Sequence, residues 1–126
     1  MQSNPVVWFE IYVQDMKRAK SFYEAMLSIK LEKLNDPGPG VLEMMTFPMQ
    51  MAATGASGAL VRMKDGPANG NSVIVYFSCE DCAAESKKAA ENGGKVMKDK
   101  LSIGQHGFIS LVYDTEGNVV GLHSMN

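Results

Sequence analysis

The side chains of this chain best suited to chemistry alternate along one short segment near its N-terminus. In the run 6–13, VVWFEIYV, the even positions Trp8, Glu10 and Tyr12 each carry a polar or amphipathic side chain. Successive side chains of a β-strand point to opposite faces, so these three are expected to share one face. A carboxylate between two aromatic side chains suits the binding of a small molecule's polar end, and also general acid–base work.

Further candidates lie later in the chain. His123 could share an acid–base role with Glu10, because imidazole changes charge near neutral pH. We take Glu10 and His123 as the catalytic candidates, and the ligand-binding candidates are Trp8, Glu10, Tyr12, Arg62, Tyr76 and His123. Both catalytic candidates also have simple structural interpretations. Glu10 would pair with Arg62 or with a backbone amide, and His123 would be a hydrogen-bonded strand residue.

The two cysteines of the chain, Cys79 and Cys82, form a C-x-x-C motif. Such a pair can be a redox site at a helix N-terminus or half of a zinc site. Here Glu80 and Asp81 lie between the two cysteines and would raise the pKa of a thiol, and no second pair of cysteines exists to complete a zinc site. We therefore predict that both cysteines are apolar filler of the core.

The elements that position Trp8, Glu10 and Tyr12 are a strand and the helix after it. The odd positions of the strand are apolar and are predicted to pack under that helix: Val7, Phe9, Ile11 and Val13. Asp15 is placed to cap the helix. The apolar stripe predicted for the helix comprises Met16, Ala19, Phe22, Tyr23, Met26 and Leu27.

The same pattern returns 66 residues later, and this repeat indicates the domain organisation. Val73, Val75, Phe77 and Cys79 repeat the apolar alternation, and Glu80-Asp81 with an alanine-rich helix follows. Each half then reads β-α-β-β-β. We predict one domain, 1–126, with a first module at about 5–63, a linker at 64–71 and a second module at about 72–126.

Composition excludes several classes of partner. The net charge is −2 without a basic block, which argues against nucleic acid and against an anionic membrane surface. No run reaches the ~18 apolar residues of a membrane span, and no signal peptide pattern opens the chain. We expect a cytoplasmic protein that does not contact membranes.

Three segments of the chain resemble the vicinal-oxygen-chelate superfamily, which contains glyoxalase I, bleomycin resistance proteins and extradiol dioxygenases. They are VVWFEIYVQDMKRAKSFYEAML at 6–27, VIVYFSCEDCAAESKKAAENGGKV at 73–96 and YDTEGNVVGLHS at 113–124. The resemblance is greatest to small glyoxalase-like members. It implies an α+β fold of two tandem βαβββ modules, whose eight strands form an open cup with the helices outside and the ligand within.

Strand phase then assigns residues to the inside of that cup. They are Trp8, Glu10 and Tyr12 from the first strand, Ile74, Tyr76 and Ser78 from the fifth, and Val119, Gly121 and His123 from the last. The fourth strand contributes either Gly58, Leu60 and Arg62 or their neighbours. The first of these choices would place the Arg62 guanidinium in the site.

Catalytic members of the superfamily hold a divalent metal with His and Glu side chains on four cup strands. Carried over to this chain, the ligand positions fall at or near Trp8, Ile74, Gly121 and Gly58. The last of these rests on a match of Gly58-Ala59-Leu60 with Gly121-Leu122-His123. None of the four has a ligating side chain, so no metal and no cofactor is predicted. A weakly bound divalent metal on Glu10 and His123 is the alternative.

The resulting functional prediction is a glyoxalase-like protein that binds a small, partly apolar molecule in the cup without a tightly held metal. The alternative is a lyase, isomerase or hydrolase that uses Glu10 and His123. A homodimer is also predicted, because half-barrels expose strand edges and apolar surface and because related small members pair.

Overall fold

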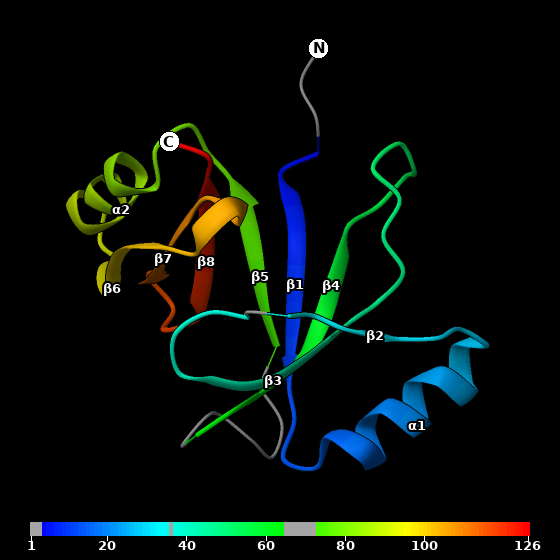
Figure 1. The fold of residues 1–126 in the computed structure, drawn as a ribbon. Coiled ribbons are helices and arrows are strands. Elements are labelled where there is room, and N and C mark those ends of the chain that lie inside the picture. The colour runs from blue at the N-terminus through cyan, green and yellow to red at the C-terminus, as the bar shows by residue number, and fades with distance from the viewer. Residues whose placement is uncertain (1–3, 36, 65–72) are drawn as a thin grey trace. The chain divides into compact units, whose positions relative to one another are not determined.

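A computed structural model describes residues 4–35, 37–64 and 73–126 of the chain. The fold class is α+β, as predicted, and the described residues form eight strands and two α-helices (Figure 1). Two compact units are present: an N-terminal unit, Trp8–Val73, and a C-terminal unit that joins Met1–Val7 to Ile74–Asn126. The predicted linker lies outside the described residues, except for Lys64.

Each half of the chain has the predicted order β-α-β-β-β. The first half contains β1 (Val6–Tyr12), α1 (Met16–Leu27), β2 (Glu32–Lys33), β3 (Val41–Thr46) and β4 (Ser57–Met63). The second half contains β5 (Val73–Ser78), α2 (Cys82–Glu91), β6 (Lys95–Ser102), β7 (Phe108–Tyr113) and β8 (Val119–Ser124), with a 3₁₀ turn at Gly104–His106.

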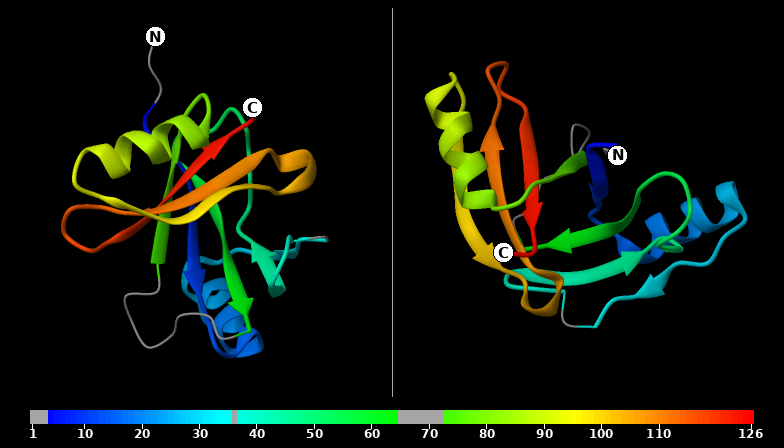
Figure 2. Two further views of the ribbon diagram at one scale, coloured as in Figure 1. Left: turned by 90° about the vertical axis from the view of Figure 1, so that its left-hand side faces the viewer. Right: turned by 90° about the horizontal axis from the view of Figure 1, so that it is seen from above.

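Strand pairing follows the same plan in both halves. In the first, the order is β2-β3-β4-β1, with β1 and β4 parallel and the other neighbours antiparallel. In the second, the order is β6-β7-β8-β5, with β5 and β8 parallel and the others antiparallel. Helix α2 packs along β6, β7 and β8 (Figure 2). The duplication read from the sequence is therefore a duplication of topology.

Both helices begin at the aspartates that the repeat singled out. The Asp15 carboxylate accepts a hydrogen bond from the backbone N–H of Arg18, and the Asp81 carboxylate accepts one from the N–H of Ala83. Each aspartate has extended backbone angles, as an N-cap residue should. The acidic position after β1 and β5 thus has the same role in both modules.

The sheet of the N-terminal unit has two distinct faces. Phe9, Ile11 and Val13 pack with Leu60 and Met16 under α1, as predicted, whereas Val7 is 39% exposed and lies outside this cluster. On the face away from α1, Trp8 and Tyr12 of β1 pack with Ala59 and Val61 of β4 and Met44 of β3. Trp8 and Tyr12, which were predicted to share one face of β1, therefore do lie on one face of this sheet.

The apolar stripe of α1 is narrower than predicted. Met16, Ala19 and Tyr23 pack on the sheet, but Phe22, Met26 and Leu27 are 57%, 56% and 50% exposed. A helix that covers one sheet buries only the residues directly above it, and the exposed ones lie around its side. No described helix is long and apolar enough to cross a membrane.

Candidate functional site

The Glu10 carboxylate joins the two aromatic side chains that flank it along β1. Tyr12 Oη donates a hydrogen bond of 2.7 Å to Glu10 Oε1, and Trp8 Nε1 donates one of 3.2 Å to Glu10 Oε2. The Glu10 side chain is 9% exposed, while Trp8 and Tyr12 are partly buried. Residues two apart on a strand share a face, so the local geometry brings all three predicted groups together. The result is a fixed, nearly buried acceptor between two rings.

A row of residues on the same face continues from Glu10 across the sheet. Glu10 of β1 is paired with Ala59 of β4. Ala59 is in turn paired with Thr46 of β3, and Thr46 is paired with Glu32 of β2. Ala59 is fully buried and Thr46 is 6% exposed. Neighbouring strands lie about 4.8 Å apart, so the backbone positions of Glu10 and Glu32, at the ends of the row, are separated by about 14 Å across the sheet. Sequence reasoning missed Thr46 and Glu32, because it did not fix the register of the strands.

A shallow depression of about 280 Å³ lies at the Glu32 end of this row. It is lined by Lys30, Glu32, Thr46, Phe47, Pro48 and Met49. Phe47 also packs on Phe9 of the α1 face, with ring centroids 5.3 Å apart. Nothing in the sequence pattern indicates this depression, since Pro48 and Met49 lie between β3 and β4, outside any helix or strand.

Arg62 belongs to the opposite face of the sheet. Its register partner is Glu43, and its Nε lies 3.4 Å from Glu43 Oε1. Arg62 is in phase with Leu60, which packs under α1, whereas Ala59 and Val61 share the face of Trp8 and Tyr12. The sequence left two alternatives open for the fourth strand. In the structure Ala59 and Val61 lie on the Glu10 face, and Gly58, Leu60 and Arg62 do not.

The match of Gly58 with Gly121 is wrong by one residue. Glu10 pairs with Ala59 in the first module, and Tyr76, which lies 66 residues after Glu10, pairs with Gly121 in the second. Ala59 is therefore the counterpart of Gly121. A slip of one residue moves every side chain to the other face, so the ligand position expected near Gly58 moves to Ala59. An alanine cannot ligate a metal either.

Tyr76 and His123 share a face of the C-terminal unit, the one away from α2. Their strands pair as Tyr76 with Gly121 and Ser78 with His123, while Phe77 and Leu122 pack with Cys82 under α2. Tyr76 is 4% exposed. A Cβ atom added to Gly121 would lie 2.3 Å from Cδ1 of the Tyr76 ring. The ring therefore occupies the space that any side chain at position 121 would need.

His123 is hydrogen-bonded to the backbone through one of its nitrogens. Its Nε2 lies 2.6 Å from the carbonyl oxygen of His106, which can only accept. The proton is thus assigned to Nε2, and in the neutral ring Nδ1 is then the acceptor. This contact fits the simple structural interpretation of His123. Glu10 and His123 belong to different units, so their pairing stays a prediction.

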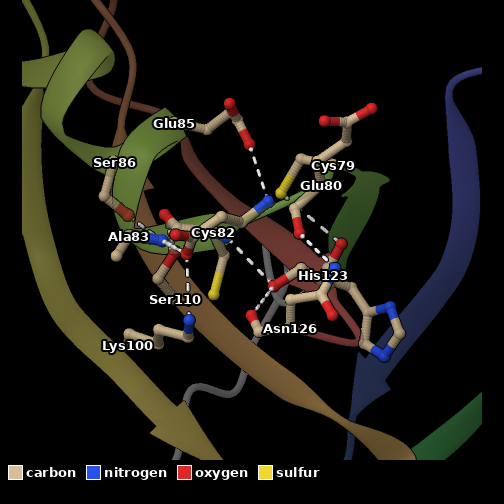
Figure 3. A network of polar contacts seen from close by, with 12 residues as sticks. Cys79, Glu80, Cys82, Ala83, Glu85, Ser86, Lys100, Ser110, His123 and Asn126 are labelled. Carbon is tan, nitrogen blue, oxygen red and sulfur yellow. Dashed lines mark hydrogen bonds and ion pairs between the residues drawn. The ribbon is translucent and has the colours of Figure 1, made fainter.

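The C-x-x-C motif lies in a polar network at the start of α2 (Figure 3). Cys82 is fully buried, and its N–H donates to Ser124 Oγ at 3.0 Å. Burial, and then the neighbouring Glu85 carboxylate, raise the pKa of the Cys79 thiol to about 12. Lys100 Nζ lies 2.9 Å from Asp81 Oδ1, and this contact is the main cause that lowers the pKa of Asp81. Cys79 therefore offers no thiolate, and Cys82 is a buried core residue against which Cys79 packs, in agreement with a role as core filler.

The donor set for a metal is sparse. Within residues 4–35, 37–64 and 73–126, no three His, Cys, Asp or Glu side chains gather closely enough to hold an ion. The positions carried over from the superfamily are occupied by Trp8, Ile74, Gly121 and, after the register correction, Ala59. These residues do not fit the metal centre of the catalytic members.

Comparison with known proteins assigns the family. Residues 6–122 match the Glyoxalase/Bleomycin resistance protein/Dioxygenase superfamily, and the chain belongs to it. It is 30% identical over 122 residues to the putative glyoxylase CFP32 of Mycobacterium tuberculosis (strain CDC 1551 / Oshkosh), covering 94% of this chain and 45% of that protein. The chain thus spans about half the length of this relative. A glyoxylase-like domain-containing protein of Didymella fabae is 28% identical over 113 residues, covering 86% of this chain and 84% of that protein.

Solved structures with the same fold are more distant in sequence. The hypothetical protein BH1468 of Bacillus halodurans C-125 gives a TM-score of 0.75 at 15% identity, over 99% of this chain and 96% of that one. Methylmalonyl-CoA epimerase of Mycobacterium tuberculosis gives a TM-score of 0.69 at 13% identity, over 97% of this chain and 88% of that one. At such identities the likeness establishes the fold alone.

Proposed function

We propose that this chain binds a small, partly apolar molecule on the sheet face that carries Trp8, Glu10 and Tyr12, without a tightly held metal. The observation that carries the proposal is the Glu10 carboxylate, held by the Trp8 indole and the Tyr12 hydroxyl. Aromatic surface supplies apolar contact at a low cost in conformational entropy, and a fixed carboxylate orients the polar end of a ligand. Tyr76 and His123 are the residues of the C-terminal unit proposed to contribute to binding.

Fluorescence of Trp8, the single tryptophan of the chain, provides the test. A small-molecule library is screened with the parent protein and with the variants Glu10→Gln and His123→Ala. Hits should change Trp8 emission, and their affinity should fall in the Glu10 variant. Trp8→Ala, followed by calorimetry, should weaken them by roughly 1–3 kcal/mol, from the apolar area of the ring.

Glu43→Gln is the matched control, since it removes a carboxylate from the opposite face of the same sheet. Hits should bind this variant as they bind the parent. Identical affinities in the parent, the Glu10 variant and the His123 variant would refute a site built on this pair.

The absence of a tightly held metal is tested separately. Plasma emission spectroscopy on protein purified without chelator should find well below one equivalent of zinc, nickel, manganese or iron. A stoichiometric metal that is lost in Glu10→Gln would move the proposal to a metalloenzyme.

The second candidate is a lyase, isomerase or hydrolase that uses Glu10 and His123, with or without a weakly bound divalent metal. The observation in its favour is the His123 hydrogen bond to the His106 carbonyl, which leaves Nδ1 as an acceptor for a proton. Each fluorescence hit is incubated with the protein in deuterated water and followed by NMR. Deuterium uptake or turnover that depends on both side chains would favour the enzyme over the binding protein.

A further inference from the structure

The depression of about 280 Å³ beside Glu32 is used by neither candidate function. Phe47, Pro48 and Met49 form its apolar wall, and Lys30 and Glu32 add one basic and one acidic side chain. Small-molecule sites are typically concave and apolar, with a few polar groups that orient the ligand. Most hold roughly 300–1,000 Å³, so this smaller depression suits a molecule the size of a single amino acid.

The depression lies where strands β2 and β3 part. The backbone N–H of Leu34 donates to the carbonyl of Met44 at 3.0 Å, and every second pair of an antiparallel ladder is bonded in this way. Continued by four residues, the pairing would bring Lys30 opposite Pro48. Proline has no N–H to donate, so the ladder ends at Glu32 and the two chains separate. The position of the opening thus follows from one proline.

The charged wall is held in place by the end of α1. Ile29 and Leu31 pack in the cluster under α1, and the N–H of Leu31 donates to the Glu24 carboxylate at 2.8 Å. Lys30 and Glu32 alternate with these two apolar residues and are exposed. Their backbone positions are two residues apart, at most about 7 Å. A basic and an acidic side chain therefore stand side by side on a fixed segment.

The apolar wall is also fixed by hydrogen bonds. The N–H of Phe47 donates to the Gly58 carbonyl at 2.9 Å, and the Ser57 hydroxyl lies 3.3 Å from the carbonyl oxygen of Phe47 and 3.1 Å from that of Pro48. Met49 is 54% exposed, and its flexible thioether can adapt to the shape of a ligand. Because both walls are held, little ordering is needed on binding.

The charges of Lys30 and Glu32 are available to a ligand. In the described part of the chain, neither side chain forms an ion pair or a hydrogen bond. Glu24 is engaged by other groups. Its pKa is lowered chiefly by the Leu31 N–H, then by Lys20 at 3.1 Å, and least by the charge of Lys30. A ligand with one negative and one positive group could therefore pair with both walls' charges.

We infer that this depression binds a zwitterionic α-amino acid with an apolar side chain. The α-carboxylate pairs with the Lys30 ammonium, the α-ammonium pairs with the Glu32 carboxylate, and the side chain packs on the apolar wall. The inference goes beyond the proposed function and does not depend on it, because the backbone of Glu10 lies about 14 Å from that of Glu32 across the sheet.

Four probes separate the groups of the ligand. They are L-phenylalanine, 2-phenylethylamine, which lacks the carboxylate, 3-phenylpropanoate, which lacks the ammonium, and glycine, which lacks the apolar side chain. Binding is followed by amide chemical shifts in NMR titrations and by isothermal titration calorimetry. L-phenylalanine should bind about fivefold more tightly than either singly charged analogue, since an exposed ion pair contributes up to about this factor. Glycine should bind least, and the amides of Lys30, Glu32 and Met49 should shift together.

Variants identify the charges responsible. Lys30→Met should weaken L-phenylalanine and 3-phenylpropanoate about fivefold and leave 2-phenylethylamine unchanged. Glu32→Gln should weaken L-phenylalanine and 2-phenylethylamine and leave 3-phenylpropanoate unchanged. Lys33→Met is the matched control, because Lys33 is paired with Met45, which packs under α1, and does not line the depression. Thermal unfolding verifies that each variant is folded before it is compared.

The outcomes separate this inference from the proposed function. It is refuted if L-phenylalanine, L-leucine and L-methionine all fail to bind saturably at millimolar concentration, or if a singly charged analogue binds as tightly as L-phenylalanine. It is also refuted if Lys33→Met weakens binding as much as Lys30→Met does. Amino-acid binding that required Glu10 in place of Lys30 and Glu32 would refute it too, and would support the proposed function. Library hits that ignore Glu10→Gln, Trp8→Ala and His123→Ala would refute the proposed function alone.

Discussion

The hydroxyl of Tyr12 donates a hydrogen bond of 2.7 Å to the Glu10 carboxylate. The exposed fraction of Glu10 is only 9%, so water cannot readily replace this donor. Tyr12→Phe should therefore lower the free energy of unfolding by about 1.5–3 kcal/mol, the value of a hydrogen bond to a charged group. Urea denaturation measures the change.

The control is a double-mutant cycle with Glu10→Gln. In the Glu10→Gln background, Tyr12→Phe should lower the free energy of unfolding by clearly less, because the charged partner of the Tyr12 hydroxyl is absent. Equal costs in the two backgrounds would show that the hydroxyl does not act through Glu10.

Phe9 anchors the opposite face of β1. It packs in the cluster under α1 and contacts the ring of Phe47. Phe9→Ala should cost roughly 3–5 kcal/mol, as the loss of a packed aromatic side chain does. Val7→Ala, in the same strand phase but 39% exposed, should cost less than about 1 kcal/mol. Similar costs for the two variants in denaturant unfolding would contradict the assignment of this face.

The thiol of Cys79 should be inert in the folded protein. Its pKa is raised from 9.0 to about 12, so the thiol remains protonated near neutral pH. At about pH 8, iodoacetamide should label neither cysteine in the native protein and both in urea, as read by mass spectrometry. Rapid labelling of Cys79 in the native state would contradict this environment.

The same shift predicts a dependence of stability on pH. The folded state holds the Cys79 proton more tightly than the unfolded chain does, so this contribution is present below pH 9.0. It should be lost as the pH rises from 9.0 toward about 12. Melting temperatures of the parent should fall more steeply over this window than those of Cys79→Ala.

A homodimer is a further prediction, and it rests on exposed apolar surface. Phe22, Met26 and Leu27 of α1 are each at least half exposed, while the residue of α2 that matches Phe22 in the repeat is Lys88. Soluble proteins seldom leave such side chains uncovered in a group. Light scattering at micromolar concentration should give the mass of a dimer, and Phe22→Lys should shift it toward the monomer. A monomeric mass for the parent would remove the prediction.

Local patterns in the sequence were sufficient to predict most of the fold. Alternation placed Phe9 and Glu10 on opposite faces, and cap chemistry placed Asp15 and Asp81 at the helix starts, because both depend only on near neighbours. The phase of β4 could not be read in this way. Residues 58–61 are all buried, so this strand has no alternation that would reveal its faces.

The candidate site was predictable only in part, for a similar reason. The grouping of Trp8, Glu10 and Tyr12 follows from spacing along one strand. The partners of Arg62 and His123 cannot be predicted from such spacing. Glu43 approaches Arg62 from another strand, and the His106 carbonyl approaches His123 from a turn. The hydrogen bonds that fix these side chains are set by strand register, which no single stretch of sequence contains.

The Tyr76 ring over Gly121 also limits the order in which this chain could acquire new side chains. A glutamate or histidine at position 121 would need the volume that the ring occupies, since even a Cβ would lie 2.3 Å from it. As a first change, Gly121→Glu would therefore be eliminated by misfolding before any new chemistry could be selected. A smaller residue at position 76 must come first, so the two positions are expected to be epistatic, and a mutational route to a metal ligand on β8 begins on β5.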